Sequence, residues 1–425
     1  MVAVATAVVL SQIVNRRTSL KLIGGMSAGL SGCRGPAPIR VGILHSLSGT
    51  MAVSEKAVVE AALLRIDEIN TAGGLLGRQV VAVVADGRSE PAVFASETRR
   101  LVQQEKVCVI FGCWTSASRR TVRPVIEELG HLLVYPVQYE GLEESRHIIY
   151  TGAAPNQQII PAVKWSMDHL GKRFFLVGSD YVFPRAANAI IRDQTAALQG
   201  TIVGEEYVRL GSSSVGDIVT RIVKAKPDVV LNTLNGETNV ALFRALREAG
   251  LSTDDLPVVS FSVGENELRS MPVGDVAGHY AAWNYFQSVS SEKNRDFVAH
   301  FKRRYGSERV TSDPMEAAYV GVGLWAQAVT ETGTEEVLAV RDAMRRQSMN
   351  APEGVVSVDP DNGHTWKVVR IGRVREDGLF DVVWSSNTPI QPQPFPALRP
   401  RAAWDQFLVD LYQGWGGAWA NQGPA

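Results

Sequence analysis

The sequence predicts an α/β protein of two lobes, each a doubly wound parallel sheet, joined by three crossover segments. The first observation is length, because 425 residues exceed the roughly 100–200 residues of a typical domain. The second is that short apolar runs alternate with segments of helix length, which is the pattern of βαβ units around a parallel sheet. The third is that this alternation occurs in two successive series that do not repeat each other's sequence.

The first series begins after Pro38, and its apolar runs are predicted to be strands. Three glycines after the first predicted helix, at 73, 74 and 77, end that helix and turn the chain into the next strand. The predicted strands are residues 39–44, 80–85, 107–111 and 132–135, and the predicted helices are residues 53–70, 91–104 and 116–129.

The second series continues the same alternation and is followed by three helices and a hairpin-like stretch. Asp313 is predicted as the N-cap of one of these helices, with Pro314 at its first position. The predicted strands are residues 174–178, 201–208, 228–233, 257–261, 355–358, 365–371 and 379–384. The predicted helices are residues 184–198, 215–225, 239–249, 294–305, 314–331 and 335–347.

Segments near 151–155, 278–284 and 351–353 are interpreted as the crossovers between the lobes. Residues 38–153 with 285–351 would then form the first lobe, and residues 155–280 with 354–386 the second. Residues 387–425 are interpreted as a strap and tail, because five prolines between 389 and 400 exclude a helix or a central strand there. The apolar stretch 404–419 is either a helix docked on its own lobe or an element that binds a partner.

The composition is that of an ordinary soluble globular protein, with 45% hydrophobic and 20% charged residues. Its 43 basic and 44 acidic residues leave a formal charge of -1. That balance provides no basic surface for nucleic acid or for an anionic membrane, so neither is expected as a partner through charge.

Residues 1–33 are predicted to be an export signal, since Arg16 and Arg17 precede an apolar stretch that is too short to span a membrane. The pattern resembles a twin-arginine signal, and the general secretory route remains open. Leu30-Ser31-Gly32-Cys33 resembles a lipobox, in which Cys33 would carry a lipid; a chance cysteine after a signal peptide is the alternative. The expected location is periplasmic or cell-surface, with a lipid anchor.

No catalytic or metal-binding motif is present, so neither an enzyme nor a metal or cofactor is expected. The seven histidines are scattered, and His45 either lines a crevice or is a hydrogen-bonded structural residue. Cys108 and Cys113 would lie about 16 Å apart along one strand, beyond the reach of a disulfide, and are predicted to be free thiols.

Polar and aromatic loops follow strands in both series, and the carboxyl ends of parallel strands face one crevice. Ser116 opens a predicted helix and either donates to a ligand or serves as an N-cap, and both can hold. The aromatic residues suit a planar ligand, with core packing as the alternative. Tyr181 would close over a ligand, while Asn235 and Glu265 would accept its N–H groups; Glu265 could instead be a solvated helix cap. The candidate residues are Trp114, Ser116, Tyr135, Val137, Gln138, Tyr139, Tyr181, Asn235 and Glu265.

Several long motifs carry a resemblance to a known family, among them Tyr135-Pro136-Val137-Gln138-Tyr139-Glu140-Gly141 and Gly178-Ser179-Asp180-Tyr181. From about 39 to 394 the chain resembles the substrate-binding proteins of branched-chain amino-acid and amide uptake systems, and most of all the urea-binding branch. The other matching motifs are residues 45–51, 114–116, 152–157, 232–236 and 280–286.

The resemblance implies a type I periplasmic-binding-protein fold, a ligand that is urea or a short-chain amide, and an ABC transporter permease as partner. It also implies ligand contacts from Ser116, Val137 and Tyr181, with Trp114, Tyr135, Gln138 and Asn235 around them. The alternative is an amide-sensing regulatory protein of the amidase-regulator type. Those relatives are cytoplasmic, so the predicted export signal argues against that role.

Overall fold

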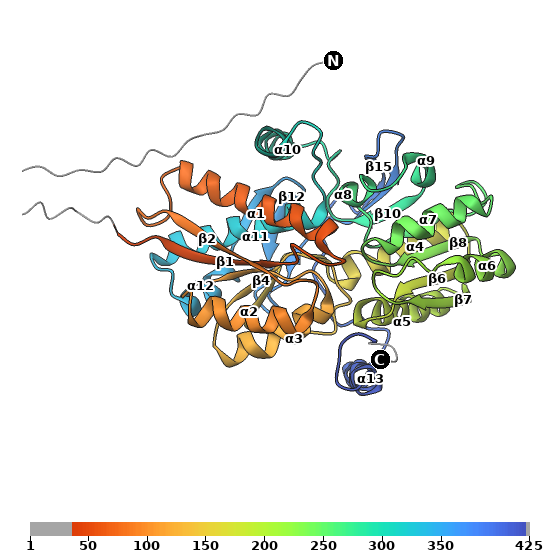
Figure 1. Ribbon diagram of the computed structural model, residues 1–425, viewed down its shortest axis with the longest axis horizontal. Coiled ribbons are helices and arrows are strands. Elements are labelled where there is room, and N and C mark those ends of the chain that lie inside the picture. Colours follow the sequence, from red (N-terminus) through yellow and green to blue (C-terminus); the bar gives the residue numbers. More distant parts are fainter. Residues whose placement is uncertain (1–35, 422–425) are drawn as a thin grey trace, which may run out of the picture. The chain divides into compact units, whose positions relative to one another are not determined.

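Residues 36–421 are described by the computed structural model, and they form two lobes, each built around its own sheet (Figure 1). The predicted export signal, including Arg16, Arg17 and the lipidation site Cys33, lies outside the described residues. Among helices of the described part, none is long and apolar enough to cross a membrane.

The sheet of the first lobe has five parallel strands in the order β2-β1-β3-β4-β5. The first four were predicted, although β3 and β4 are only three residues long, and β5 was not predicted. Because the order reverses at β1, the carboxyl ends of β1 and β3 form a crevice at the point where the connections diverge. The strands are β1 (Ile39–His45), β2 (Val80–Asp86), β3 (Ile110–Gly112), β4 (Leu133–Tyr135) and β5 (Ile148–Tyr150).

Helices cover both faces of this sheet (Figure 1). On one face α1 packs against α11, and on the other α2 packs against α3. The helices of the first lobe are α1 (Ala52–Thr71), α2 (Pro91–Gln103), α3 (Ser116–Glu128), α10 (Glu292–Tyr305), α11 (Asp313–Thr332) and α12 (Val337–Met344).

The second lobe repeats this strand order and adds two edge strands, giving β15-β14-β10-β9-β8-β6-β7. The five strands from β6 to β10 are parallel, whereas β14 and β15 run antiparallel to their neighbours. The second crevice lies at β6 and β8. The strands are β6 (Arg173–Ser179), β7 (Thr201–Val208), β8 (Val229–Thr233), β9 (Val258–Ser260), β10 (Tyr280–Trp283), β14 (Arg370–Val374) and β15 (Phe380–Ser385).

The helices of the second lobe connect these strands, and the last helix of the chain packs against α5. The docked-helix interpretation of the stretch 404–419 therefore describes the structure. The helical elements are η1 (Pro155–Gln157), α4 (Ile159–His169), α5 (Val182–Ala197), α6 (Gly216–Ala225), α7 (Thr238–Glu248), α8 (Glu265–Leu268), α9 (Val273–Val276) and α13 (Arg401–Gly414).

A small antiparallel sheet of β11 (Ser348–Ala351), β12 (Gly354–Val358) and β13 (Thr365–Trp366) changes the predicted division of the chain. Alternate residues of β12, Val356 and Val358, point into the core of the first lobe. The chain therefore turns back as a hairpin at 352–353, where a crossover was predicted, and passes to the second lobe only after β13.

The helix start predicted at Asp313 is also different. Ser312 is the N-cap, and the Asp313 carboxylate instead accepts the backbone N–H groups of Asn284 and Tyr285, each at 2.9 Å. Since Asn284 follows β10 at the second crossover, this carboxylate fixes a segment that passes between the lobes.

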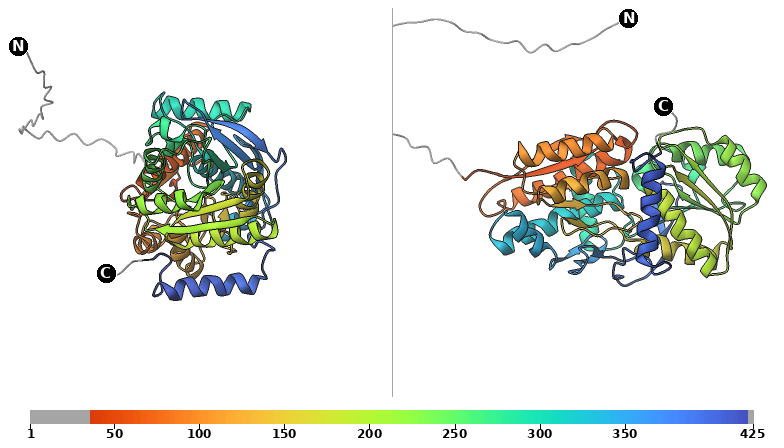
Figure 2. Two further views of the ribbon diagram at one scale, coloured as in Figure 1. Left: turned by 90° about the vertical axis from the view of Figure 1, so that its right-hand side faces the viewer. Right: turned by 90° about the horizontal axis from the view of Figure 1, so that it is seen from below.

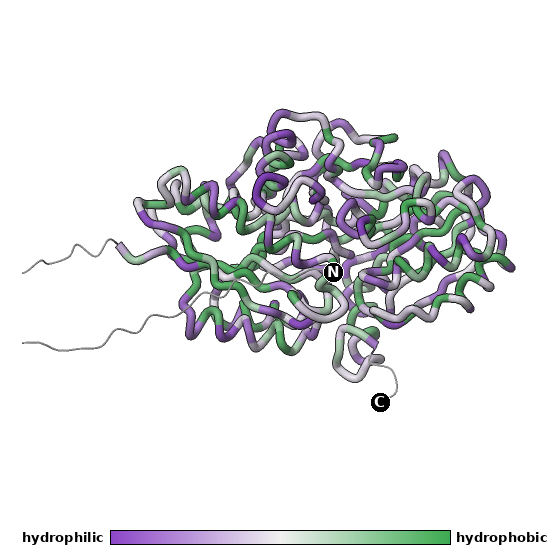
Figure 3. Tube along the Cα trace, turned by 45° about the horizontal axis from the view of Figure 1, so that its top comes forward, coloured by the Kyte–Doolittle hydropathy of each residue, from purple (hydrophilic) through white to green (hydrophobic). Residues whose placement is uncertain are grey.

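The apolar cores follow the strands of each lobe, as the hydropathy colouring shows (Figure 3). Figure 2 shows α13 running along the junction between the lobes. Burial on both faces explains why the parallel strands appear in the sequence as continuous apolar runs rather than as alternating ones.

The first crossover provides a test of the packing. A Cβ atom on Gly152 would lie 2.1 Å from the carbonyl carbon of Val137, a backbone atom that cannot move without shifting the loop after β4. We expect Gly152→Ala to lower the free energy of unfolding by about 2 kcal/mol or more in urea-free guanidinium titrations. Gly216→Ala is the matched control, because no atom lies within 4 Å of its added Cβ, and should be neutral or stabilise by up to about 1 kcal/mol. Equal effects of the two substitutions would contradict this packing.

Candidate ligand-binding site

The candidate site is formed where the crevices of the two sheets face each other. Trp114 and Ser116 follow β3, and Tyr181 and Asn235 follow β6 and β8, so predicted residues lie at the crevice of each lobe. The lobes are in contact there, because a Cβ on Gly236 would lie 3.1 Å from the carbonyl oxygen of Thr50 in the first lobe. All nine predicted residues are buried, with at most 3% of each exposed.

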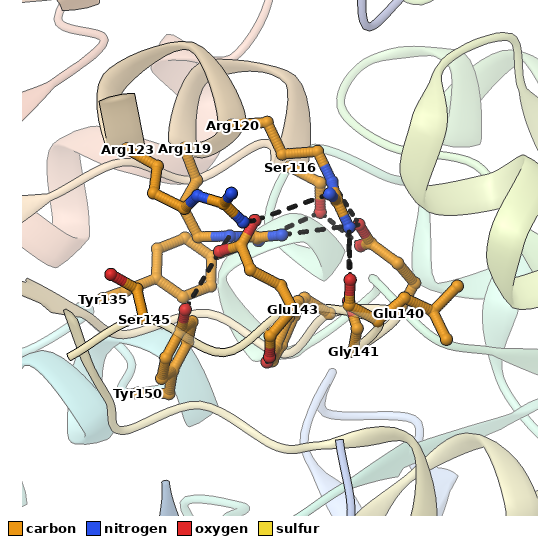
Figure 4. A network of polar contacts seen from close by, with 12 residues as sticks. Ser116, Arg119, Arg120, Arg123, Tyr135, Glu140, Gly141, Glu143, Ser145 and Tyr150 are labelled. Carbon is orange, nitrogen blue, oxygen red and sulfur yellow. Dashed lines mark hydrogen bonds and ion pairs between the residues drawn. The ribbon is translucent and has the colours of Figure 1, made fainter. Parts of the chain in front are cut away.

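Ser116 is the first residue of α3 and is held by a buried ionic network (Figure 4). Its hydroxyl donates to Glu140 Oε2 at 2.5 Å and accepts from Arg119 at 3.1 Å. The other oxygen of Glu140 accepts from Arg120 Nε at 3.1 Å. Thr115, not Ser116, is the N-cap, accepting from the N–H of Ser118 at 3.1 Å, which leaves the Ser116 hydroxyl to face the network.

Glu143 is the second buried carboxylate that pairs with Arg119 and Arg120. Its carboxylate accepts from Arg119 Nε and from the Tyr150 hydroxyl, each at 3.0 Å. Burial alone would raise the pKa of Glu143, but the guanidinium groups of Arg119, Arg120 and Arg123 outweigh it and lower that pKa to about 2. Glu143 is therefore ionised at every physiological pH.

Aromatic rings enclose the guanidinium group of Arg119. It lies 4.7 Å from the ring centroid of Tyr135 and 4.3 Å from that of Tyr139, within cation–π range. Tyr139 stacks on Tyr150, which stacks on His364 at 4.1 Å. Burial lowers the pKa of His364 to about 3, so this ring is neutral when it bonds to the Tyr139 hydroxyl. Tyr139 therefore packs against the Arg119 guanidinium and helps to fix its position.

The remaining predicted residues of the first lobe, Trp114, Tyr135 and Val137, belong to its apolar core beside the loops after β3 and β4. The Tyr135 hydroxyl donates to the carbonyl oxygen of Trp114 at 2.6 Å, which joins the loops after β3 and β4. Val137 packs in the core of the first lobe. His45, at the end of β1, is the hydrogen-bonded residue that one of the alternatives described, since its Nδ1 lies 2.9 Å from Glu55 Oε2.

Tyr181 and Asn235 come from the second lobe. Burial raises the pKa of the Tyr181 hydroxyl well above its usual value, and the charges of Tyr135 and Glu140 from the first lobe add to the rise. Tyr181 is the N-cap of α5, and α5 packs against α3 of the first lobe, so Tyr181 lies on an element of the second lobe that contacts the helix of Ser116. The backbone N–H of Asn235 donates to Ser179 Oγ at 3.1 Å, and its side-chain amide donates to Thr233 at 3.3 Å.

Gln138 bridges the lobes. Its amide nitrogen donates to the carbonyl oxygen of Phe261 at 2.9 Å and to Ser262 Oγ at 3.1 Å, both after β9. Its amide oxygen is buried and has no hydrogen-bond partner. The side chain therefore joins the two lobes and leaves one acceptor available.

Glu265 is bonded to the segment that follows the second crossover. One carboxylate oxygen accepts the N–H of Gln287 at 2.6 Å, and its electrostatic neighbours are Glu267 and Asp313. It is fully buried, so the solvated-cap alternative is wrong. Its other carboxylate oxygen is buried without a hydrogen-bond partner, so Glu265 keeps an acceptor and remains a predicted ligand residue.

The sequence did not identify the buried charges that hold the site together. Arg119 and Arg120 occupy the first turns of α3, where charged residues are ordinarily solvated, yet they are 0% and 7% exposed. Their partners Glu140 and Glu143 lie in the loop between β4 and β5. Two adjacent arginines at the carboxyl edge of a predicted sheet were the available signal.

A cavity of about 450 Å³ opens at the lobe boundary next to these loops. It is lined by residues including Val53, Gly236, Glu237 and Arg244, and by none of the nine predicted side chains. Gly236 is the neighbour of Asn235, so this cavity borders the candidate site without containing it.

Cys108 and Cys113, the cysteines within residues 36–421, are free, as predicted. Burial raises the pKa of the Cys108 thiol to about 12 and raises that of Cys113 further. Among the described residues there is no group of three side chains that could hold a metal ion.

The buried Glu265 generates a prediction about pH. Burial raises its pKa from 4.5 to about 8, so between those values the folded protein holds a proton that the unfolded chain releases. Its contribution to the free energy of unfolding is therefore present below about pH 4.5 and is lost as the pH rises toward 8. Glu265→Gln should make stability fall less steeply from pH 5 to pH 8 in denaturant titrations. Glu248→Gln, at an exposed position, should keep the wild-type dependence of stability on pH. If Glu265→Gln shows that same dependence, the raised pKa of Glu265 is contradicted.

Comparisons with known proteins identify the family. A curated relative called limonene hydroxylase, from Geobacillus stearothermophilus, is 35% identical over 118 residues, which are 28% of this chain and 22% of that protein. The chain thus spans less than a quarter of that relative, and its activity does not carry over. A Leu/Ile/Val-binding protein homolog from Brucella abortus is 21% identical and covers 84% of this chain and 93% of its own.

Solved structures show the fold. The branched-chain amino-acid transporter substrate-binding protein LivJ from Streptococcus pneumoniae, in complex with isoleucine, superimposes with a TM-score of 0.74 at 21% identity, over 84% of this chain and 100% of its own. The predicted type I periplasmic-binding-protein fold is therefore confirmed. The family model described as periplasmic binding protein domain matches residues 39–401, so the chain belongs to the periplasmic-binding-protein family.

Proposed function

We propose that this protein captures urea or a short-chain amide between its two lobes and delivers it to an ABC transporter permease. The observation that carries the proposal concerns the first-lobe side of the site, which we call the wall and which consists of Ser116, Arg119, Arg120, Glu140 and Glu143. In the wall the positive charges of the arginines are offset by the two carboxylates. Arg119 and Arg120 are both engaged by Glu140 and Glu143 inside the protein. A neutral polar ligand therefore suits the wall better than an anion does.

Charge balance bears on the ligand class. A ligand carboxylate entering this wall would approach Glu140 and would have to compete with it for the guanidinium groups, because both arginines already lie in ion pairs. Burying an uncompensated charge is expensive, whereas urea and amides carry none. The isoleucine bound by the Streptococcus pneumoniae neighbour has such a carboxylate, so a different ligand is expected here.

Hydrogen-bonding groups are of both kinds, as urea requires. Urea has one carbonyl acceptor and two amino groups that donate. The backbone N–H groups in the first turn of α3 are donors for a ligand carbonyl, and Glu140, Gln138 and Asn235 carry oxygen acceptors for amino groups. Gln138 Oε1 is already buried without a partner. Buried acceptors of this kind favour a ligand that donates N–H groups.

Size and shape support a small, planar ligand. Trp114, Tyr135 and Tyr181 are at most 3% exposed, and their rings offer flat apolar faces with polar edges. Acetamide replaces one amino group of urea with a methyl group. The unpaired acceptor would weaken binding by about tenfold to a hundredfold.

Delivery to a permease requires that the closed form differ from the open one. Because the ligand would touch both lobes only when they are closed, binding favours the closed arrangement, which is the form a permease would bind. Export through the signal at residues 1–33 and lipidation at Cys33 would place the protein at the membrane surface and remain part of the proposal.

Calorimetric titration of the chain from Pro36 onward with urea, acetamide, formamide and isoleucine tests this function. We expect urea to bind with micromolar or tighter affinity and acetamide at least tenfold more weakly. Isoleucine binding without urea binding would contradict the proposal and favour an amino-acid ligand.

A matched pair of variants tests the wall itself. Ser116→Ala removes the hydroxyl that faces Glu140 and should weaken urea binding at least tenfold. Ser118→Ala, two residues along α3, removes a hydroxyl that bonds to Thr115 and Cys113 rather than to Glu140, and should change the affinity less than twofold. If both variants bind urea like the wild type, Ser116 is not part of the site.

A further inference from the structure

The C-terminal tail ends on the candidate site, and it is anchored first on the second lobe. Trp404 of α13 is fully buried and donates from its indole nitrogen to the carbonyl oxygen of Pro396 at 3.0 Å. Arg399 forms a bidentate ion pair with Asp193 of α5, at 2.5 and 2.8 Å. These contacts fix α13 along the lobe junction (Figure 2).

After α13 the chain turns back toward the cleft. Gly416 and Gly417 have φ values of +65° and +84°, a backbone conformation that residues other than glycine rarely adopt. The turn brings residues 419–421, which we call the latch, beside the loop that carries Tyr181.

The latch pairs with that loop as a short antiparallel ladder. Ala420 forms a β-bridge with Tyr181, and the N–H of Val182 donates to the carbonyl oxygen of Trp419 at 3.0 Å. On the other side of the bridge, the N–H of Asn421 donates to the carbonyl oxygen of Asp180 at 3.0 Å. These backbone bonds join the latch to the second lobe.

The side chain of Trp419 reaches the first lobe. Its ring lies 5.0 Å from the guanidinium carbon of Arg120, a cation–π distance, and Tyr412 packs on it at 4.7 Å. Arg120 in turn donates to Glu140, whose other oxygen accepts the Ser116 hydroxyl. One residue of the tail therefore connects the Tyr181 loop to the Ser116 network.

We propose that Trp419 is a positioning residue of the binding cleft, and that the latch stabilises the closed arrangement of the lobes by holding Arg120 against the Tyr181 loop. This rests on the proposed function only in taking the cleft at Ser116 and Tyr181 as the ligand site. Because the backbone of the latch is bonded to the Tyr181 loop of the second lobe, opening of the lobes would separate Trp419 from Arg120. The contact thus favours closure before a ligand arrives and slows ligand release afterwards.

The decisive experiment measures lobe closure without any ligand. Spin labels at Glu90→Cys and Asp217→Cys lie beside the cleft, before α2 of the first lobe and in the first turn of α6 of the second, and both positions are exposed. Pulsed electron resonance would give their distance distribution in the mature full-length chain. Protein without the added cysteines controls for labelling of Cys108 and Cys113.

Three variants are compared on this background. Trp419→Ala should add a longer-distance component that the parent lacks, and Trp419→Phe, which keeps an aromatic face, should give a smaller one. Trp415→Ala is the control, because Trp415 packs on the second lobe without a contact to Arg120 and should leave the distribution unchanged. An unchanged distribution for Trp419→Ala, or equal changes for Trp419→Ala and Trp415→Ala, overturns the proposal.

A second measurement separates this proposal from the ligand assignment. If urea binds, Trp419→Ala should raise its dissociation rate at least threefold in stopped-flow displacement, with little change in the association rate. If urea does not bind, the distance measurement still decides the role of the latch. Unchanged urea dissociation together with an unchanged distance distribution contradicts the latch while leaving the urea assignment intact.

Discussion

The ion pairs of Arg119 and Arg120 with Glu140 and Glu143 are the interaction on which the site depends. They join the start of α3 to the loop after β4, and so fix the two walls of the first-lobe crevice relative to each other. Such pairs add little stability when compared with a well-packed apolar core. Removing one partner, however, leaves a buried charge unpaired and lowers the free energy of unfolding by about 3–5 kcal/mol. The network therefore holds one geometry and strongly disfavours others.

The same network determines what the wall offers to a ligand. Because the arginines are satisfied internally, the groups left for a ligand in the proposed site are carboxylate and amide oxygens, backbone N–H groups and aromatic faces. Across the boundary, Tyr181 and the latch complete the enclosure, with Trp419 resting on Arg120. In this proposal, the guanidinium groups of Arg119 and Arg120 bind the carboxylates that determine the ligand class. Arg120 also contacts Trp419 of the tail, which would stabilise closure of the lobes.

The sequence predicted the two-lobe α/β fold well, because the alternation of apolar runs with helix-length segments is a local feature of the chain. It could not predict that Arg119 pairs with residues more than twenty positions away, since charged side chains at a helix start usually face water. The third crossover was misplaced because β12 shows the alternation of an ordinary strand, and only its packing assigns it to the first lobe. The sequence also did not reveal that Glu265 is fully buried and accepts the N–H of Gln287, because a carboxylate at the start of a short helix usually faces water.

A crystal structure of the protein grown with urea tests the central claim most directly. The account predicts density for a planar ligand between Ser116 and Tyr181, with Arg119 still paired to Glu143 and Arg120 still paired to Glu140. A bound carboxylate that displaces Glu140 from the arginines, or a ligand that lies away from Ser116, would contradict it.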